Sequence, residues 1–447
     1  MTNYIKNKWS EICGDKHSSE VVHRVALSLA LRIIGAGVGF AFNVAVARLL
    51  GASDAGVFFL ALAVTTVGSV IGRLGLDNSL LRFVSTSAAA ADWGRVRGVY
   101  SIGLRWAILA SSGIAAGLFF MAPWLANNLF IKENIAEPLR WMSLSIVPFT
   151  MLNLTAESFK GLKQIGKAMF VQGIGLPIVA LCLIYPLVGI FGVNGAVWAY
   201  SIATVVIAAL SIWLWNKATV LHKDAGVFSY KILWDSCSHL AVAGVLNRAV
   251  LPWAPIFFLG IWEPVAEVGV FSAANRTVML ITLLLFSVNN VVAPKFSELY
   301  VKNDIASLER VAQLMTKVVL FGTAPIFLAL IFFSKEIMGV FGESFRNGGG
   351  ILVVLSIGQL VNAATGSVGI LLIATGNERG YQRITVYSAF ILIVLSLIMV
   401  PSIGAMGAAI AVSIAVAVNN IGATWMVYRK LRVVIFPGLK NLLRKHE

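Results

Sequence analysis

The sequence predicts an all-α polytopic membrane protein with about twelve transmembrane helices, arranged as two six-helix pseudo-repeat lobes around a central cavity. Three observations support this fold class. The chain is 58% hydrophobic and only 12% charged, with a mean hydropathy of +0.86. Its apolar residues fall in runs of spanning length, and short motifs recur at a constant separation. Because soluble domains are about half apolar and a quarter charged, the expected solvent is lipid.

Twelve segments are long enough to span a membrane, which takes about 20 mostly apolar residues. The connections between them are short, so we expect no soluble domain on either side. The first segment far exceeds the apolar core of about 7–15 residues in a cleaved signal peptide, so we expect it to remain as a helix. The predicted spans are 21–47, 55–81, 98–122, 136–158, 168–190, 194–215, 233–260, 268–293, 307–333, 349–373, 382–402 and 405–428.

The positive charges predict the orientation of these spans, because cytoplasmic loops are enriched in Lys and Arg. With the N-terminus inside, 26 of the 35 Lys and Arg residues fall on the cytoplasmic side and 5 on the other. We therefore expect a multi-pass protein of the inner (cytoplasmic) membrane with both termini in the cytoplasm. The basic residues are scattered in short runs, so no nucleic-acid partner is expected.

An internal repeat divides the chain into two halves. Gly56-Val57-Phe58 and Arg82-Phe83 recur 213 positions later as Gly269-Val270-Phe271 and Lys295-Phe296. Parallel six-helix repeats of this kind build transporters whose two lobes rock around a site near the membrane midplane. The predicted organisation is an N-terminal segment at 1–20, an N-lobe at 21–215, a cytoplasmic linker at 216–232, a C-lobe at 233–428 and a basic tail at 429–447.

The four basic residues assigned to neither side are arginines inside predicted spans: Arg32, Arg73, Arg248 and Arg276. A charge at the bilayer centre costs about 2.5–3.5 kcal/mol even on the lenient insertion scale, so these side chains are expected to face a lumen rather than lipid. Their planar guanidinium groups suit phosphate. With two amides on the same polar helix faces, the predicted substrate-binding residues of the lumen are Arg32, Arg248, Arg276, Arg73, Asn43 and Asn290.

Two acidic residues inside spans two and four, Asp77 and Glu157, are candidates for proton coupling. A structural role fits them equally, because Asp77 lies four residues after Arg73 and Glu157 precedes a loop rich in lysine. Pro252 and Pro255 interrupt the backbone hydrogen bonds of span seven and predict a bend there. We find no catalytic constellation, phosphate-binding loop or metal-ligand spacing, and therefore expect no enzyme, no cofactor and no metal.

Several motifs resemble polysaccharide-unit flippases of the Wzx type, which belong to the MOP (multidrug/oligosaccharidyl-lipid/polysaccharide) superfamily. They are Ala47-Arg48-Leu49-Leu50-Gly51, Gly75-Leu76, Leu81-Arg82-Phe83-Val84, Thr375-Gly376-Asn377 and Gly407-Ala408-Ala409-Ile410-Ala411. The resemblance covers essentially the whole chain in length, span count and repeat.

This resemblance implies a V-shaped pair of lobes with a cationic lumen, working by alternating access. It implies translocation of undecaprenyl-pyrophosphate-linked oligosaccharide units from the cytoplasmic to the periplasmic leaflet for lipopolysaccharide or exopolysaccharide synthesis. The lumen arginines of such flippases lie on the helices that carry Arg32, Arg248 and Arg276 here. The implied partners are the lipid-linked glycan, the bilayer, a glycan polymerase and a chain-length regulator.

Three other functions compete with this interpretation. An ion-coupled drug or small-molecule antiporter of the same superfamily would need acids rather than arginines in the lumen. A lipid II flippase usually carries two further helices, for which this chain has no room. A membrane glycan polymerase or ligase usually has a large periplasmic loop, whereas the outer loops here are short.

Overall fold

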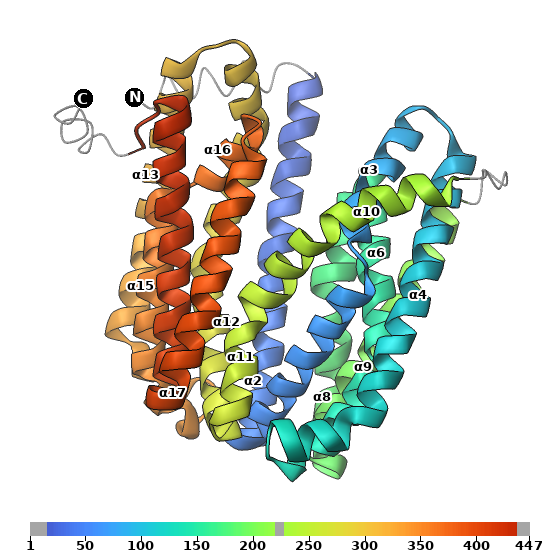
Figure 1. Ribbon diagram of the computed structural model, residues 1–447, viewed down its shortest axis with the longest axis vertical. Helices are drawn as coiled ribbons and strands as arrows, with labels where there is room; N and C mark the ends of the chain where they lie inside the picture. Colours follow the sequence, from blue (N-terminus) through green and yellow to red (C-terminus); the bar gives the residue numbers. More distant parts are fainter. Residues whose placement is uncertain (1–15, 220–227, 436–447) are drawn as a thin grey trace.

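The computed structural model describes residues 16–219 and 228–435, which are helical almost throughout (Figure 1). The N-terminal set comprises α2 (Lys16–Gly72), α3 (Leu76–Ala89), α4 (Trp93–Trp124), η1 (Leu125–Leu129), η2 (Glu133–Ile135), α5 (Ala136–Ser143), α6 (Ile146–Gly161), α7 (Ile165–Met169), η3 (Phe170–Gly175), α8 (Leu176–Phe191) and α9 (Val193–Thr219). The C-terminal set comprises α10 (Tyr230–Val245), η4 (Leu246–Val250), α11 (Leu251–Trp262), α12 (Val265–Val301), α13 (Ile305–Phe332), α14 (Ser334–Gly339), η5 (Glu343–Gly348), α15 (Gly349–Thr365), α16 (Val368–Ala374) and α17 (Glu378–Leu431).

The described residues confirm the predicted all-α polytopic architecture. Within residues 16–219 and 228–435, eight helices are long and apolar enough to cross a membrane. Two of them hold parts of two predicted spans: α2 contains span one and the first part of span two, with a reversal at Gly51, and α17 contains spans eleven and twelve, with a reversal at Gly404. The two remaining predicted spans are built from shorter pieces, span four from α5 and α6 and span seven from α10, η4 and α11.

The internal repeat is visible in the backbone. Gly192, between α8 and α9, has φ 56° and ψ −132°, and its counterpart Gly404 has φ 58° and ψ −137°. Only glycine adopts this conformation readily. Three residues further on, a Cβ on Gly195 would overlap the carbonyl oxygen of Leu187, and one on Gly407 that of Met399. The hairpins between spans five and six and between spans eleven and twelve therefore have the same geometry.

The two sets of helices meet at the lower end of Figure 1 and spread apart toward the upper end. At the lower end α2 and α12 cross at Gly56 and Gly269, the repeat-related glycines. A Cβ on Gly56 would overlap the carbonyl oxygen of Val265, and one on Gly269 would overlap that of Ala52. Glycine at both positions thus allows the two backbones to touch, as small residues do at membrane helix crossings.

Two basic side chains add polar contacts between the sets at this end. Lys132 donates to the carbonyl oxygen of Gly260 at 2.5 Å, and Arg48 donates to that of Val340 at 2.7 Å. Burial lowers the pKa of the Lys132 amine, while the nearby Glu263 acts in the opposite direction. The lower end is therefore closed by backbone packing and by hydrogen bonds to main-chain carbonyls.

Span seven crosses between the two sets (Figure 1). Its first part, α10, packs on α3 and α4, where Ser236 hydrogen-bonds Ser79 at 2.9 Å. Its last part, α11, packs mainly on α17. The change of direction coincides with the π-helical turn η4, directly before Pro252. A proline lacks the N–H that would bond to the carbonyl four residues earlier, so the regular ladder cannot continue through this turn. The bend predicted from Pro252 and Pro255 is thus present.

We predict that Gly56→Ala destabilises the protein whereas Gly37→Ala does not. Both glycines lie in α2, but a Cβ on Gly56 meets the backbone of α12, whereas one on Gly37 meets nothing within 4 Å. Overpacking at Gly56 should cost about 1–3 kcal/mol, while Gly37→Ala should gain up to about 1 kcal/mol of helix propensity. Thermal unfolding of the two purified variants in detergent measures the difference. Equal unfolding temperatures would show that the glycine crossing does not hold the lobes together.

The topology generates a second prediction. In Figure 1 the start of α2 and the ends of α9 and α17 lie at the upper end, while η2 and the α11–α12 turn lie at the lower end. Reporters fused after Lys223 or at the C-terminus should report cytoplasm, because basic residues concentrate on that side. Fusions near Glu133 and Glu263 should report periplasm. A periplasmic signal at the C-terminus would mean an odd number of spans. Lys223 and residues 436–447 lie outside the described residues.

Candidate substrate-binding site

Span two is broken in its middle, between α2 and α3. Leu74 and Gly75 both adopt left-handed backbone conformations, with φ of 52° and 74°. Glycine tolerates this conformation, whereas it is strained for leucine. The break places Arg73 just after α2 and Asp77 in the first turn of α3, where the amino end of a helix stabilises a carboxylate.

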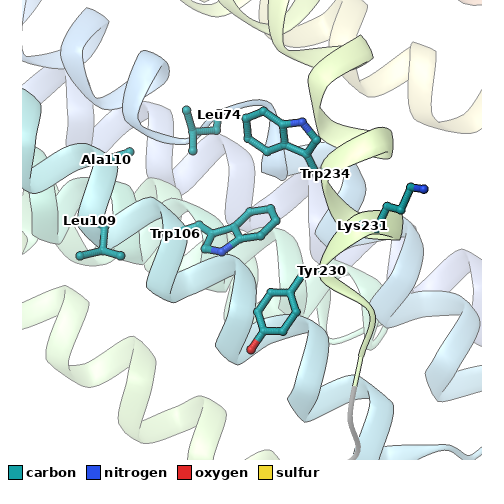
Figure 2. Close-up of a pocket in the computed structure, with 7 residues that line it drawn as sticks. All are labelled: Leu74, Trp106, Leu109, Ala110, Tyr230, Lys231 and Trp234. Atoms are coloured by element: carbon teal, nitrogen blue, oxygen red, sulfur yellow. The ribbon is translucent and has the colours of Figure 1, made fainter.

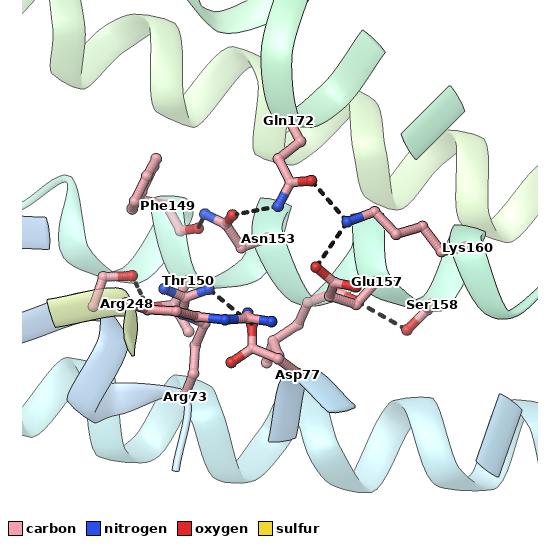
Figure 3. A network of polar contacts seen from close by, with 12 residues as sticks. Arg73, Asp77, Phe149, Thr150, Asn153, Glu157, Ser158, Lys160, Gln172 and Arg248 are labelled. Atoms are coloured by element: carbon pink, nitrogen blue, oxygen red, sulfur yellow. Dashed lines mark hydrogen bonds and ion pairs between the residues drawn. The ribbon is translucent and has the colours of Figure 1, made fainter. Parts of the chain in front are cut away.

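One carboxylate oxygen in this break serves two arginines (Figure 3). Oδ1 of Asp77 accepts a hydrogen bond from Arg73 at 2.8 Å, and the guanidinium of Arg248 lies 2.7 Å from the same atom. Arg248 belongs to η4, so this ion pair joins the C-terminal set to the N-terminal set. The side chains of Arg73 and Asp77 are 5% and 8% exposed, whereas that of Arg248 is 34% exposed.

The three side chains carry one more positive than negative charge, and their hydrogen-bonding capacity is not used up. Among the described residues, the buried Nε of Arg73 has no hydrogen-bond partner. A buried guanidinium group that shares its only carboxylate with a second arginine is suited to bind another anion.

Polar side chains continue from this cluster along one face of α6. Thr150 lies 3.0 Å from the hydroxyl of Ser69, Asn153 accepts a hydrogen bond from Gln172 at 3.1 Å, and Glu157 pairs with Lys160 at 2.9 Å. The ammonium group of Lys160 also donates to the side chain of Gln172, as Figure 3 shows. Gln172 lies in η3, a π-helical turn of the kind often found at functional sites.

The other predicted lumen residues lie apart from this cluster. The guanidinium of Arg32 sits over the ring of Phe286 at 5.6 Å, and that of Arg276 sits over Phe59 at 4.8 Å, so each spans the α2–α12 contact. Asn43 is buried and donates to the carbonyl of Gly39 at 2.6 Å. The side chain of Asn290 lies outside the described residues. The structure thus brings together Arg73, Asp77 and Arg248, with Glu157 close by, and leaves Arg32 and Arg276 at separate positions.

Beside the break in span two, an apolar pocket of about 570 Å³ opens between α4 and α10. Figure 2 shows the rings of Trp106, Tyr230 and Trp234 gathered around it, with Leu74 at one side. Trp106 stacks on Tyr230 and meets Trp234 edge-on, with ring centroids 6.2 and 5.8 Å apart. Because Leu74 directly follows Arg73, an apolar surface lies next to a cationic cluster.

Sequence reasoning missed how these residues combine. Arg248 has no acid near it in sequence, yet the fold supplies Asp77 from the other lobe. The contribution of Asn153 and Gln172 was also missed, although polar residues inside two apolar spans were a usable signal. Asp77 and Glu157 both form the salt bridges that the structural alternative required. In the described part of the chain, no three His, Cys, Asp or Glu side chains gather as metal ligands.

The fold is that of MOP-superfamily transporters. The chain matches an inward-facing multidrug resistance MATE family transporter of that superfamily with a TM-score of 0.74 and 17% identity, over 91% of this chain and 99% of the other. It matches the lipid II flippase MurJ in an inward closed conformation with a TM-score of 0.73 and 18% identity, over 91% and 87%.

The chain belongs to the polysaccharide biosynthesis protein family, which matches residues 21–300. The lipid II flippase MurJ family matches residues 265–446. Among curated proteins, the chain is 23% identical over 408 residues to the probable low-salt glycan biosynthesis flippase Agl15 of Haloferax volcanii, covering 87% of this chain and 79% of that protein. It is also 25% identical over 147 residues to the capsular polysaccharide biosynthesis protein CapF of Staphylococcus aureus, covering 33% of this chain and 37% of that protein. The resemblance to polysaccharide-unit flippases is confirmed, and the fold is the one seen in transporters of the MOP superfamily.

The shared carboxylate generates a prediction about stability. Asp77→Asn leaves the buried Arg73 without a counter-ion and should cost about 3 kcal/mol or more. Arg248→Gln should lower the free energy of unfolding by about 1 kcal/mol or less, because the salt bridge between Asp77 and Arg73 remains and Arg248 is partly exposed. Thermal unfolding of the purified variants measures both effects.

Glu298→Gln is the matched control for these variants. Glu298 also pairs with two cations, and hydrogen bonds from Lys295 and Lys302 lower its pKa to about 2, but the site is exposed. Its substitution should leave the unfolding temperature unchanged. A larger loss with Arg248→Gln than with Asp77→Asn would contradict the assigned roles.

Proposed function

We propose that this protein is a flippase that moves undecaprenyl-pyrophosphate-linked oligosaccharide units from the cytoplasmic to the periplasmic leaflet of the inner membrane. The observation that carries the proposal is the cluster of Arg73, Asp77 and Arg248, with its excess positive charge, beside an apolar aromatic pocket. A diphosphate joined to a polyprenyl chain has the matching pair of properties. The family and the flippase Agl15 among its relatives support the same class of substrate.

The geometry suggests how the diphosphate would act on the lobes. Arg248 is the most exposed member of the cluster, and its ion pair with Asp77 connects the two sets of helices. A diphosphate offers a guanidinium group paired, charge-assisted hydrogen bonds and competes with the carboxylate for it. Substrate binding would therefore replace the Arg248–Asp77 contact between the lobes by a contact between Arg248 and the diphosphate. The substrate would then bind more tightly to the conformation in which the lobes have separated at this point, and such a difference in affinity is what shifts a conformational equilibrium.

The apolar pocket would hold the part of the lipid chain next to the diphosphate. Its walls are almost entirely apolar, with Lys231 as the charged exception. Leu109, on α4, is 73% exposed, so the pocket continues onto an apolar outer surface. A polyprenyl tail would thus stay in contact with lipid while its head group enters the lumen.

We propose Asp77 and Glu157 as the groups that couple transport to a proton gradient. Each carboxylate is buried, and each holds a cation in place: Arg73 and Arg248 for Asp77, and Lys160 for Glu157. Protonation of Asp77 would release both arginines for the diphosphate. The site contains both the acid to be protonated and the cations that this step would free.

Two rival functions fit the site less well. A drug or cation antiporter needs unpaired carboxylates in its cavity, whereas Asp77 and Glu157, the buried acids of the described residues, face guanidinium or ammonium groups. A glycan polymerase or ligase would leave single units displayed outside the cell when its gene is deleted. Loss of a flippase instead strands lipid-linked units on the inner leaflet. A polymerase and a chain-length regulator would act on the exported units as partners.

We predict that Arg32→Ala, Arg248→Ala and Arg276→Ala each abolish surface glycan while the protein remains in the membrane. Lys at the same positions should restore part of the export, because the charge is kept but the planar fork is lost. The variants are expressed in a strain that lacks the native gene. Immunoblotting of its membranes gives the amount of protein, and surface glycan is measured on the same cells. Normal glycan in all three variants would overturn the cationic-lumen mechanism.

Arg73→Ala provides the contrast in the same assay. Arg73 is almost fully buried, so its loss leaves Asp77 with one partner and creates a cavity, and the amount of protein in the membrane should itself fall.

Proton coupling predicts that Glu157→Gln lowers export while the amount of protein in the membrane stays normal. Export that continues unchanged after the proton gradient is collapsed in vesicles would exclude proton coupling.

A further inference from the structure

A second polar cavity lies inside the C-terminal set, between α11, α15 and α17, with a volume of about 200 Å³. Five polar side chains line it, and the other lining residues are apolar. We call this cavity the amide pocket, after its polar residues Asn362, Tyr381, Ser388, Asn419 and Asn420. We propose that the amide pocket binds a neutral sugar ring of the transported glycan, an inference that rests on the proposed function.

The chemistry of the lining selects the class of ligand. None of the residues that line the amide pocket is charged. A phosphate would need Arg or Lys, and a metal cation would favour carboxylates, as hard cations take oxygen ligands of high charge. Amide side chains offer both hydrogen-bond donors and acceptors, and the hydroxyl groups of a sugar ring need both as partners. A neutral, hydroxyl-rich ligand is therefore the best match.

One buried acceptor in the amide pocket is left without a hydrogen-bond partner among the described residues. Asn420 is held at both ends, since it accepts from Thr365 at 3.2 Å and donates to the carbonyl of Val416 at 2.9 Å. Ser388 donates to the carbonyl of Ala415. The buried Oδ1 of Asn419, by contrast, meets no donor among the described residues. A buried acceptor without a partner is unfavourable, and a ligand hydroxyl would satisfy it.

Size and position also fit one sugar attached to the diphosphate. The cavity is smaller than the about 300–1,000 Å³ of sites for drug-sized ligands, so it suits a single ring rather than an oligosaccharide. Leu251 lines it and follows Arg248 by three residues, less than one helical turn. A diphosphate on Arg248 would thus hold the adjoining sugar close to the amide pocket.

The test uses the full chain, purified in lipid nanodiscs, with two separate probes. Methyl glycosides of neutral hexoses and N-acetylhexosamines, followed by saturation-transfer NMR, report on the amide pocket. Inorganic pyrophosphate, followed by calorimetry, reports on the arginine cluster. Asn419→Leu keeps the branched shape of the side chain but removes its hydrogen bonds, and Asn362→Leu does the same on α15. Asn128→Leu, in η1 far from the cavity, is the matched control.

We expect Asn419→Leu and Asn362→Leu to weaken glycoside binding at least ten-fold and to leave pyrophosphate binding unchanged. Asn128→Leu should bind both probes like the unsubstituted chain. The inference is overturned if no glycoside binds, or if both pocket variants bind glycosides normally. Failure of the proposed function looks different: pyrophosphate would not bind, or Arg248→Ala would not affect it, while the glycoside result would stand by itself.

Discussion

A single carboxylate inside an apolar span organises the centre of this molecule. Asp77 can remain charged there because two guanidinium groups and the start of α3 surround it. Arg73 reaches Asp77 because span two is broken by a left-handed turn between them. Arg248 reaches Asp77 from η4, the turn at which span seven crosses between the two lobes. Both irregular stretches thus surround the same ion pair, in which one carboxylate oxygen of Asp77 joins the two sets of helices.

The lower end and the centre of the molecule are held together by different forces. At the lower end, α2 and α12 touch through Gly56 and Gly269, and basic side chains bind main-chain carbonyls. At the centre, the contact is an ion pair whose arginine is a third exposed, with aromatic packing of α10 on α4 beside it. An anionic ligand or a proton cannot replace the backbone packing of α2 on α12. An ion pair, by contrast, can be replaced by an anionic ligand or broken by protonation. The central contacts are therefore those that a substrate can change.

The chemistry of the two lobes differs although their backbones repeat. The N-terminal set carries the buried charges, on α3 and α6, and the apolar pocket beside them. The C-terminal set carries a cavity of amides and hydroxyls without charge. A lipid-linked glycan has the same three parts in a row, an apolar chain, a diphosphate and a neutral sugar. Span seven touches all three regions, through Trp234, Arg248 and Leu251, and so connects them physically.

The sequence alone determined the class of fold, because spanning helices follow from local composition and from the length of apolar runs. It also revealed the repeat, the bend at Pro252 and the residues carrying charge. It could not show that Arg248 meets Asp77, or that Arg32 and Arg276 lie over Phe286 and Phe59, because those pairs come from helices far apart in the chain. Periodicity places a side chain on one face of its own helix. Which face meets which neighbour depends on how all the helices pack, and only the tertiary structure decides that.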